Sequence, residues 1–221
     1  MKRKAGMVHG VNTNVALFKA VAAEIMPEVD MVHLVDEGIP FLADAKSRPL
    51  AVRRMRTLSS FAEESGAQVV LITCTAFGRL VSEIQEAVKV PVLSVVEIAA
   101  TEAVNLGNSI GVLGTHPGTI TSASQIIQEE ALARGKKVEV KTRLSAEAFA
   151  ALQRQDWDTH DKLVLKLLND LMQEVKVVVI PQPSIERVLK QVPETGRKAI
   201  ILPSVRLSVQ RLKDKLDSLA G

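Results

Sequence analysis

The chain has 221 residues, of which 47% are apolar and 24% are charged, and its formal net charge is +3. This length and balance are typical of a globular protein that buries a sizeable core in one large or two small domains. Aromatic residues make up only 3% of the chain and the basic residues are spread along it, which argues against a nucleic-acid partner.

Membrane insertion, export and metal binding are not expected either. No run approaches the ~20 consecutive apolar residues that cross a bilayer. The basic start at residues 1–4 leads into an apolar run too short for a signal peptide. The single cysteine, Cys74, cannot form an internal disulfide, and the four scattered histidines give no metal-ligand spacing. We therefore expect a cytoplasmic protein with a reduced thiol and no membrane partner.

The first half of the chain alternates short apolar runs with amphipathic stretches. The apolar runs predict strands at 6–11, 29–35, 68–73 and 92–95. The stretches between them predict helices at about 13–26, 47–64, 76–88 and 97–105. Residues 36–40 are expected to form a loop at the carboxyl end of the second strand.

From residue 109 the same pattern begins again. Strands are predicted at 109–114, 137–141, 176–180 and 199–202. Helices are predicted at 120–133, 145–174 with a break near 155–158, 184–191 and 204–219, and a polar loop at 115–119. Strands that alternate with helices of this length indicate an α/β protein with parallel sheets built from right-handed β-α-β units.

The restart also predicts an internal duplication. Residues 69–74 line up with 177–182 at an offset of 108, and residues 6–9 line up with 111–114 at an offset of 105. Two similar offsets favour two Rossmann-like halves related by a pseudo-twofold, with the strand ends of both facing a shared active-site cleft. We expect the first domain to hold residues 1–97 and 204–221, and the second to hold residues 98–203.

Cys74 is predicted to lie at the carboxyl end of a buried strand, where open α/β sheets bind ligands. The N–H groups of the next helix are expected to favour its thiolate form. The alternative is that Cys74 is simply a small buried apolar residue.

Several strings of the sequence resemble the aspartate/glutamate racemase superfamily, and most closely its members of roughly 220 residues that are described as Asp/Glu or hydantoin racemases. The superfamily also includes maleate isomerase and arylmalonate decarboxylase. The matching strings are 18–24, 32–37, 73–78, 110–115, 148–152, 159–161, 181–184 and 207–212. The resemblance spans nearly the whole chain.

This resemblance implies cofactor-free proton transfer at a carbon next to a carboxylate. Racemases of the group use two thiols, one on each face of that carbon, and family members are commonly dimers. Cys74 matches the first of these cysteines, whereas the duplicated position carries Gln182, which cannot exchange a proton at neutral pH. Three routes remain open: Cys74 acts alone, as one thiol does in arylmalonate decarboxylase; it attacks as a nucleophile, as in maleate isomerase; or another residue supplies the second acid.

Other candidate site residues surround the predicted strand ends. His160, beside Asp161, is the candidate second acid, and the alternative is a structural histidine. Ligand-binding candidates in the first half are His9, Asn12, Asn14, Thr75 and Ala76. Those in the second half are Thr115, His116, Thr119, Gln182 and Ser184. Asn12 and Asn14 could equally be helix caps, while His33 and the arginines at 53–56 are interpreted as structural and as a solvated face respectively.

The expected function is that of a racemase or isomerase acting on a small carboxylic acid through Cys74. The sequence contains no glycine-rich nucleotide motif and no lysine in a pyridoxal-type context, so no cofactor is expected. Two alternatives stay open: a one-thiol decarboxylase, and a carboxylate-binding protein of the same fold without catalysis.

Overall fold

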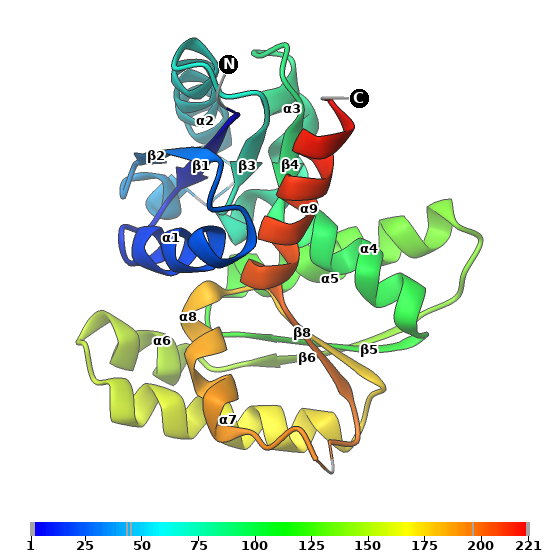
Figure 1. Cartoon of the computed structure of the whole chain (residues 1–221). Helices are drawn as coiled ribbons and strands as arrows, with labels where there is room; N and C mark the ends of the chain where they lie inside the picture. The colour runs from blue at the N-terminus through cyan, green and yellow to red at the C-terminus, as the bar shows by residue number, and fades with distance from the viewer. Residues whose placement is uncertain (1–2, 43, 45, 196, 220–221) are drawn as a thin grey trace. The chain divides into compact units, whose positions relative to one another are not determined.

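The computed structural model describes residues 3–42, 44, 46–195 and 197–219. The chain divides into two compact units, which are described separately (Figure 1). Unit 1 holds Met1–Ile98 and Val205–Gly221, and unit 2 holds Ala99–Ser204. None of the described helices is long and apolar enough to cross a membrane.

Unit 1 contains a sheet of four parallel strands in the order β2-β1-β3-β4. The strands are β1 Lys4–His9, β2 Asp30–Val35, β3 Val70–Ile72 and β4 Val92–Ser94. The helices are α1 Thr13–Ile25, η1 Ile39–Leu42, α2 Arg48–Glu64, η2 Thr75–Leu80, α3 Val81–Gln85, α4 Val95–Leu106 and α9 Ser204–Ser218, of which α4 and α9 begin or end in unit 2. All of its strands are parallel, as the alternation of strands and helices predicts.

Two apolar clusters cover the two faces of this sheet, because successive strand residues point to opposite sides. Val8, Val70 and Ile72 pack on one face with residues of α2 and α3 such as Met55 and Ile84. The other face holds Met7, Val69 and Leu71 with residues of α1 and of α9, which is drawn in red in Figure 1. The near-continuous apolar character of 69–72 follows from burial on both sides.

Unit 2 repeats this arrangement with a parallel sheet in the order β6-β5-β7-β8. Its strands are β5 Ser109–Gly114, β6 Glu139–Leu144, β7 Val177–Ile180 and β8 Ile200–Pro203. Its helices are α5 Pro117–Ala133, α6 Ala146–Gln153, α7 Trp157–Met172, α8 Pro183–Glu186 and η3 Arg187–Gln191. The predicted break near 155–158 is present, with Gln155 at a φ of 60° between α6 and α7.

The strand registers carry the same two offsets as the sequence repeat. Gly6 of β1 pairs with Val70 of β3, and Gly111 of β5 pairs with Val178 of β7. The first members of these pairs differ by 105 residues and the second by 108. The two sheets therefore have equivalent strands in equivalent registers, and the predicted α/β class with two similar domains is confirmed.

Several predicted boundaries differ from the structure: the predicted strand 137–141 is Glu139–Leu144, and the predicted helix 184–191 is α8 followed by η3. Two further differences have clear local reasons. The predicted helix 76–88 is a 3-10 helix, η2, followed by the short α3, because Phe77 has a non-helical conformation (φ −117°, ψ 18°). The predicted loop 115–119 ends early, because Pro117 begins α5. Proline suits the first turn of a helix, since the N–H that it lacks would be unpaired there.

Candidate active site

Cys74 lies two residues after the end of β3 and occupies the N-cap position of η2 with an extended backbone (φ −76°, ψ 97°). The next strand of the sheet, β1, brings Gly10 against it, and the N–H of Gly10 donates a hydrogen bond to the sulfur. A Cβ atom at residue 10 would lie 2.4 Å from Cys74 Sγ, far inside van der Waals contact. Only glycine at this position leaves room for the thiol.

The thiol of Cys74 is held in its protonated form. Burial raises the pKa of Cys74 to about 12, the carboxylate of Asp36 also raises it, and the Gly10 N–H acts in the opposite direction. The prediction that the thiolate is the favoured form is wrong, because burial raises the pKa more than the nearby N–H lowers it. At neutral pH Cys74 is therefore a proton donor rather than a resting base.

Asp36 and Arg54 form an ion pair at the same edge of the sheet. The N–H of Asp36 donates to the carbonyl of His9 over 2.9 Å, so Asp36 lies beside the end of β1. The Asp36 carboxylate also accepts the Gly38 N–H at 3.0 Å. The pair fixes the loop that carries Pro40, whose Cγ would lie 3.2 Å from a Cβ at Gly10. Arg54 is thus committed to an internal carboxylate.

His9, a predicted ligand-binding residue, is fully buried within unit 1. Its Nδ1 lies 3.0 Å from Thr73 Oγ1, and its Nε2 lies 2.9 Å from His33 Nδ1. Burial is the largest cause that lowers the pKa of His9 to about 3 and that of His33 to about 4. Both rings are therefore neutral at physiological pH, and both ring nitrogens of His9 are already engaged within the unit.

The remaining candidates of unit 1 differ in exposure. Asn12 is exposed, and its N–H lies 3.3 Å from Glu37 Oε1. Asn12 occupies the N-cap position of α1 without a side-chain capping bond, so the predicted Asn12 cap is absent. Asn14 is half-buried in the first turn of α1, Thr75 is buried at the start of η2, and Ala76 packs on the core.

In unit 2, the equivalent strand ends bring Gln182, Thr115 and His116 together. Gln182 follows β7, and its Oε1 accepts the Thr115 N–H at 2.6 Å and the His116 N–H at 3.4 Å. Its Nε2 donates to Thr115 Oγ1 at 3.2 Å. The amide oxygen of Gln182 thus accepts the N–H that corresponds to the Gly10 N–H of unit 1, which makes Gln182 a fixed hydrogen-bonding group.

His116 caps α5, because its Nδ1 accepts the Gly118 N–H at 3.1 Å. Its ring lies edge-on to Phe149 with 5.3 Å between centroids, and burial lowers its pKa. Thr119 is buried in α5, and Ser184 is half-buried in α8.

His160 is fully buried, and its Nδ1 lies 2.8 Å from Asp161 Oδ1, the neighbour expected from the sequence. Asp161 also pairs with Arg187, whose guanidinium lies 4.3 Å from the centre of the Trp157 ring. Among the described residues, nothing hydrogen-bonds to His160 Nε2. His160 therefore has the oriented imidazole that an acid or base needs.

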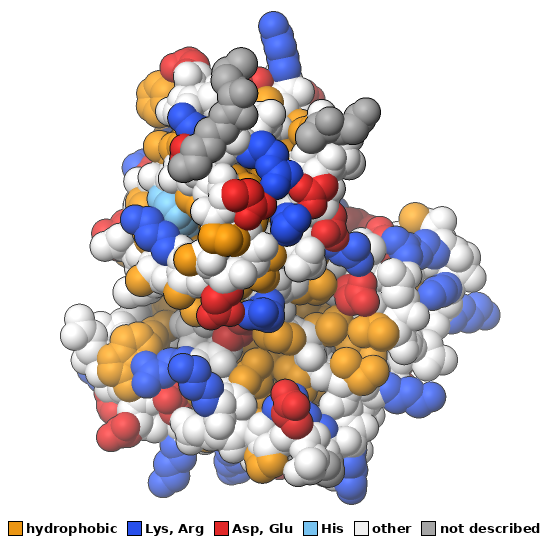
Figure 2. All heavy atoms as spheres, viewed as in Figure 1, with side chains coloured by type: hydrophobic (Ala, Val, Ile, Leu, Met, Phe, Trp, Pro, Cys, Tyr) orange, Lys and Arg blue, Asp and Glu red, His pale blue; other side chains and the backbone are white. Residues whose placement is uncertain are grey.

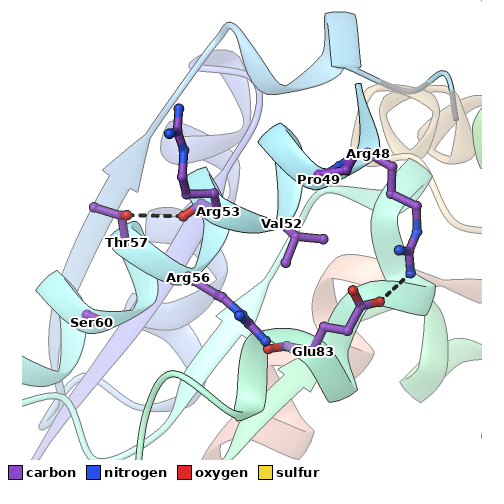
Figure 3. A pocket seen from close by; sticks show the side chains of 8 residues that line it. All are labelled: Arg48, Pro49, Val52, Arg53, Arg56, Thr57, Ser60 and Glu83. Carbon is purple, nitrogen blue, oxygen red and sulfur yellow. Dashed lines mark hydrogen bonds and ion pairs between the residues drawn. The ribbon is translucent and has the colours of Figure 1, made fainter. Parts of the chain in front are cut away.

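A separate groove of about 540 Å³ lies along α2, lined by Arg48, Pro49, Val52, Arg53, Arg56, Thr57, Ser60 and Glu83 (Figure 3). Arg48 forms an ion pair with Glu83, and Arg56 forms one with Glu86. None of the lining residues is among those described above around Cys74, which are Gly10, Asp36, Arg54 and Thr73. On the face drawn in Figure 2, basic and acidic side chains are interspersed.

The part of the chain that the structure describes contains no group of three or more His, Cys, Asp or Glu side chains that could hold a metal ion. The four residues around Cys74, which are Gly10, Asp36, Arg54 and Thr73, are not among the site residues predicted from the sequence. The repeat offset of 105 pairs Gly10 with the candidate Thr115, so this offset could have identified Gly10.

The chain was compared with known proteins by sequence and by structure. The family model described as Asp/Glu/Hydantoin racemase matches residues 7–212. No curated protein matches the chain in sequence.

Several solved racemase structures are similar to this chain. An aspartate racemase of Picrophilus torridus matches with a TM-score of 0.78 at 13% identity, covering 97% of this chain and 94% of that one. A glutamate racemase of Francisella tularensis, solved with D-glutamate, gives 0.73 at 16% identity, covering 99% of this chain and 82% of that one. An allantoin racemase of Klebsiella pneumoniae gives 0.66 at 14% identity, covering 99% and 89%. At these identities the likeness shows the fold.

The family model spans more than nine-tenths of the sequence, and the two similar parallel sheets agree with the racemase structures. The chain belongs to the Asp/Glu/hydantoin racemase family.

Proposed function

We propose that this protein is a cofactor-independent isomerase of the racemase type, which acts on a small carboxylic acid through Cys74. The observation that carries the proposal is the position of Cys74, the only cysteine, at the carboxyl end of β3 in a member of a racemase family. The Gly10 N–H directed at its sulfur supports the same role, because such a donor stabilises the thiolate that forms when the proton leaves.

The reaction requires that a proton leave and return at the carbon next to the carboxylate. Cys74 rests as a thiol, so the α-proton must first be taken by a base on the other face of the carbon. Cys74 then gives its proton to the carbon, and the resulting thiolate is the base for the reverse reaction. The second proton carrier that a racemase needs is assigned to His160, because Asp161 orients its imidazole and leaves Nε2 without a protein partner among the described residues. The acids named for two of the similar structures, glutamate and aspartate, are the first substrates to test.

A one-thiol decarboxylase is the second candidate, and the protonated state of Cys74 favours it. In that reaction the bond from the α-carbon to one carboxylate breaks and carbon dioxide leaves, so the electron pair remains on an enediolate. Cys74 then gives its proton to the carbon, and the thiolate takes up a proton from water. The fixed hydrogen bonds of Gln182 agree with this reading, because they provide no second proton carrier at that position.

Proton exchange in deuterated water tests these assignments. The protein is incubated with candidate acids, and the loss of the α-hydrogen signal is followed by NMR for the unmodified protein, Cys74→Ser and His160→Ala. We expect Cys74→Ser to lower exchange by about 100-fold or more. Exchange that survives in His160→Ala would exclude His160 as the second proton carrier and favour one-thiol chemistry. Release of carbon dioxide from a malonate-type acid would identify a decarboxylase. Binding of an acid without exchange or decarboxylation would contradict the proposal that the protein is an enzyme.

A further inference from the structure

A chain of hydrogen bonds joins the three neighbouring strands β2, β1 and β3 at their carboxyl ends. Thr73 Oγ1 lies 3.1 Å from the carbonyl of Val8 and 3.0 Å from His9 Nδ1. His9 Nε2 then lies 2.9 Å from His33 Nδ1. The two imidazoles are nearly parallel, with 5.2 Å between their centroids, as expected for rings joined edge to edge by this bond, and the Phe18 ring lies 5.6 Å from that of His9.

The direction of every bond in this chain follows from the single proton of the Thr73 hydroxyl. If Thr73 donates to Val8, its oxygen can accept from His9, so His9 carries its proton on Nδ1. His9 Nε2 is then an acceptor, and His33 donates to it from its own Nδ1. The reverse direction would leave the Thr73 contact with Val8 without a proton and bury an unpaired N–H at His33. A buried N–H without an acceptor is rarer in proteins than a buried acceptor without a donor.

The chain ends one residue away from both partners of the Cys74 contact. Thr73 precedes Cys74, and His9 precedes Gly10, whose N–H reaches the sulfur. Thr73 also donates its own N–H to the Val8 carbonyl over 3.0 Å, so it holds residues 8 and 9 through three hydrogen bonds. A small shift of residues 8–10 would move the Gly10 N–H from the thiol.

We propose that Thr73, His9 and His33 are positioning residues, whose hydrogen-bond chain holds the Gly10 N–H and the backbone around it against the Cys74 thiol. This inference rests on the proposed function only in giving Cys74 a chemical role. Two charged groups act electrostatically on this region: Asp36 on Cys74, and Lys19 of α1 on His33. Neither Asp36 nor Lys19 is part of the chain of bonds.

The first test needs no substitution in the chain. Nitrogen-15 NMR of the unmodified protein at pH 7 should show His9 and His33 as neutral rings with the proton on Nδ1. His116 should show the opposite tautomer, because its Nδ1 accepts the Gly118 N–H. The signals are assigned by loss in His116→Gln and His160→Gln, which leave unit 1 unchanged. A proton on Nε2 of either His9 or His33 would overturn the proposal.

The second test compares Thr73→Val with Thr73→Ser. Valine keeps the shape of threonine but has no hydroxyl, whereas serine keeps the hydroxyl, so only the valine variant breaks the chain. The rate at which iodoacetamide alkylates Cys74 is measured from pH 7 to 10. Because the Gly10 N–H lowers the pKa of Cys74, losing this contact raises that pKa and reduces the thiolate that reacts. We therefore expect Thr73→Val to react about tenfold more slowly at pH 8, and Thr73→Ser within about twofold of the unmodified protein.

Equal or faster alkylation in Thr73→Val would show that the chain does not position the Cys74 contact. Circular dichroism confirms that both variants are folded, and if Thr73→Val does not fold, the tautomers of the unmodified protein decide. Alkylation and tautomers are measured without substrate. Failure of the deuterium exchange experiment would therefore contradict the proposed function and leave this inference standing. Failure of the alkylation and tautomer tests would contradict this inference and leave the proposed function standing.

Discussion

The strand ends of the two units have the same backbone plan and different chemistry. In unit 1 the first N–H after β1, that of Gly10, meets the side chain that follows β3, the thiol of Cys74. In unit 2 the first N–H after β5, that of Thr115, meets the side chain that follows β7, the amide of Gln182. The repeat offsets of 105 and 108 make these positions equivalent. One unit presents a group that can exchange a proton, and the other presents a fixed acceptor and donor.

The residues behind these contacts differ in the same way. The offsets that place Thr73 and His9 in unit 1 place Pro181 and Gly114 in unit 2, so the hydroxyl and the imidazole are both missing there. Unit 2 instead closes its strand end through the side chain of Gln182 itself. The hydrogen-bond chain of Thr73, His9 and His33 therefore occurs only in the unit with the thiol. The amide of Gln182 bonds directly to the backbone and has no such chain behind it.

Acid should distinguish the two units most strongly. The unfolded chain protonates its histidines near pH 6.5, but folding lowers the pKa of His9 to about 3 and that of His33 to about 4. Unfolding therefore takes up protons below pH 6.5, so stability is intact above that value and falls as the pH drops towards 3. We expect unit 1 to lose roughly 3 to 5 kcal/mol between pH 7 and 4.5.

Hydrogen exchange at the two pH values, read by mass spectrometry, resolves the units. Unit 2 also contains a histidine with a lowered pKa, His116, so His116→Gln is the control that must leave the acid response of unit 1 unchanged. Equal protection of unit 1 at pH 7 and 4.5 would contradict the prediction.

Replacing Gly10 by alanine should have the next largest effect. Its Cβ would lie 2.4 Å from Cys74 Sγ, so the sulfur must rotate away from the Gly10 N–H. Because small displacements of reacting groups have large effects on rate, we expect proton exchange to fall by about 100-fold. The matched variant is Gly114→Ala, whose Cβ would lie 3.0 Å from Gln182 Oε1 and 3.1 Å from Ile120 Cδ1. These side-chain atoms can yield, so exchange should change by less than about tenfold; equal effects of the two variants would refute the asymmetry.

The smallest effect concerns Gln182. In Gln182→Leu the Thr115 N–H loses its acceptor inside unit 2, which should lower the free energy of unfolding by about 2 kcal/mol. In Gln182→Glu the carboxylate still accepts this N–H, and stability should remain within about 1 kcal/mol of the unmodified protein. Urea unfolding measures both variants. A leucine variant as stable as the glutamate variant would show that these hydrogen bonds do not stabilise unit 2.

The sequence predicted the fold well because burial on both faces leaves a plain pattern. Runs such as 69–72 are apolar throughout, and the repeat offsets of 105 and 108 reappear as strand registers. The ends of elements were harder to predict. Phe77 interrupts the helix after β3 in a way that helical periodicity does not reveal, and Pro117 begins α5 inside an otherwise polar loop.

The candidate site was predictable in its positions and less so in its electrostatics. Cys74 and Gln182 were located from strand ends and from the repeat, and the contacts of Gln182 with Thr115 and His116 join residues chosen from the sequence. The raised pKa of Cys74 depends on burial and on Asp36, which lies 38 positions earlier in the chain. The burial of His9 likewise depends on partners from β2 and β3. Such long-range contacts leave no local pattern.

The position of α9 has a consequence for the order in which the protein matures on the ribosome. Val205, Val209, Leu212 and Leu216 of α9 complete the apolar cluster that contains Phe18 and Ala22 of α1. All four strands of unit 1 leave the ribosome before this helix is made, whereas unit 2 is continuous from Ala99 to Ser204. Unit 2 is therefore made as one uninterrupted stretch, whereas the face of unit 1 that holds Phe18 and Ala22 stays uncovered until residues 205–216 have been made.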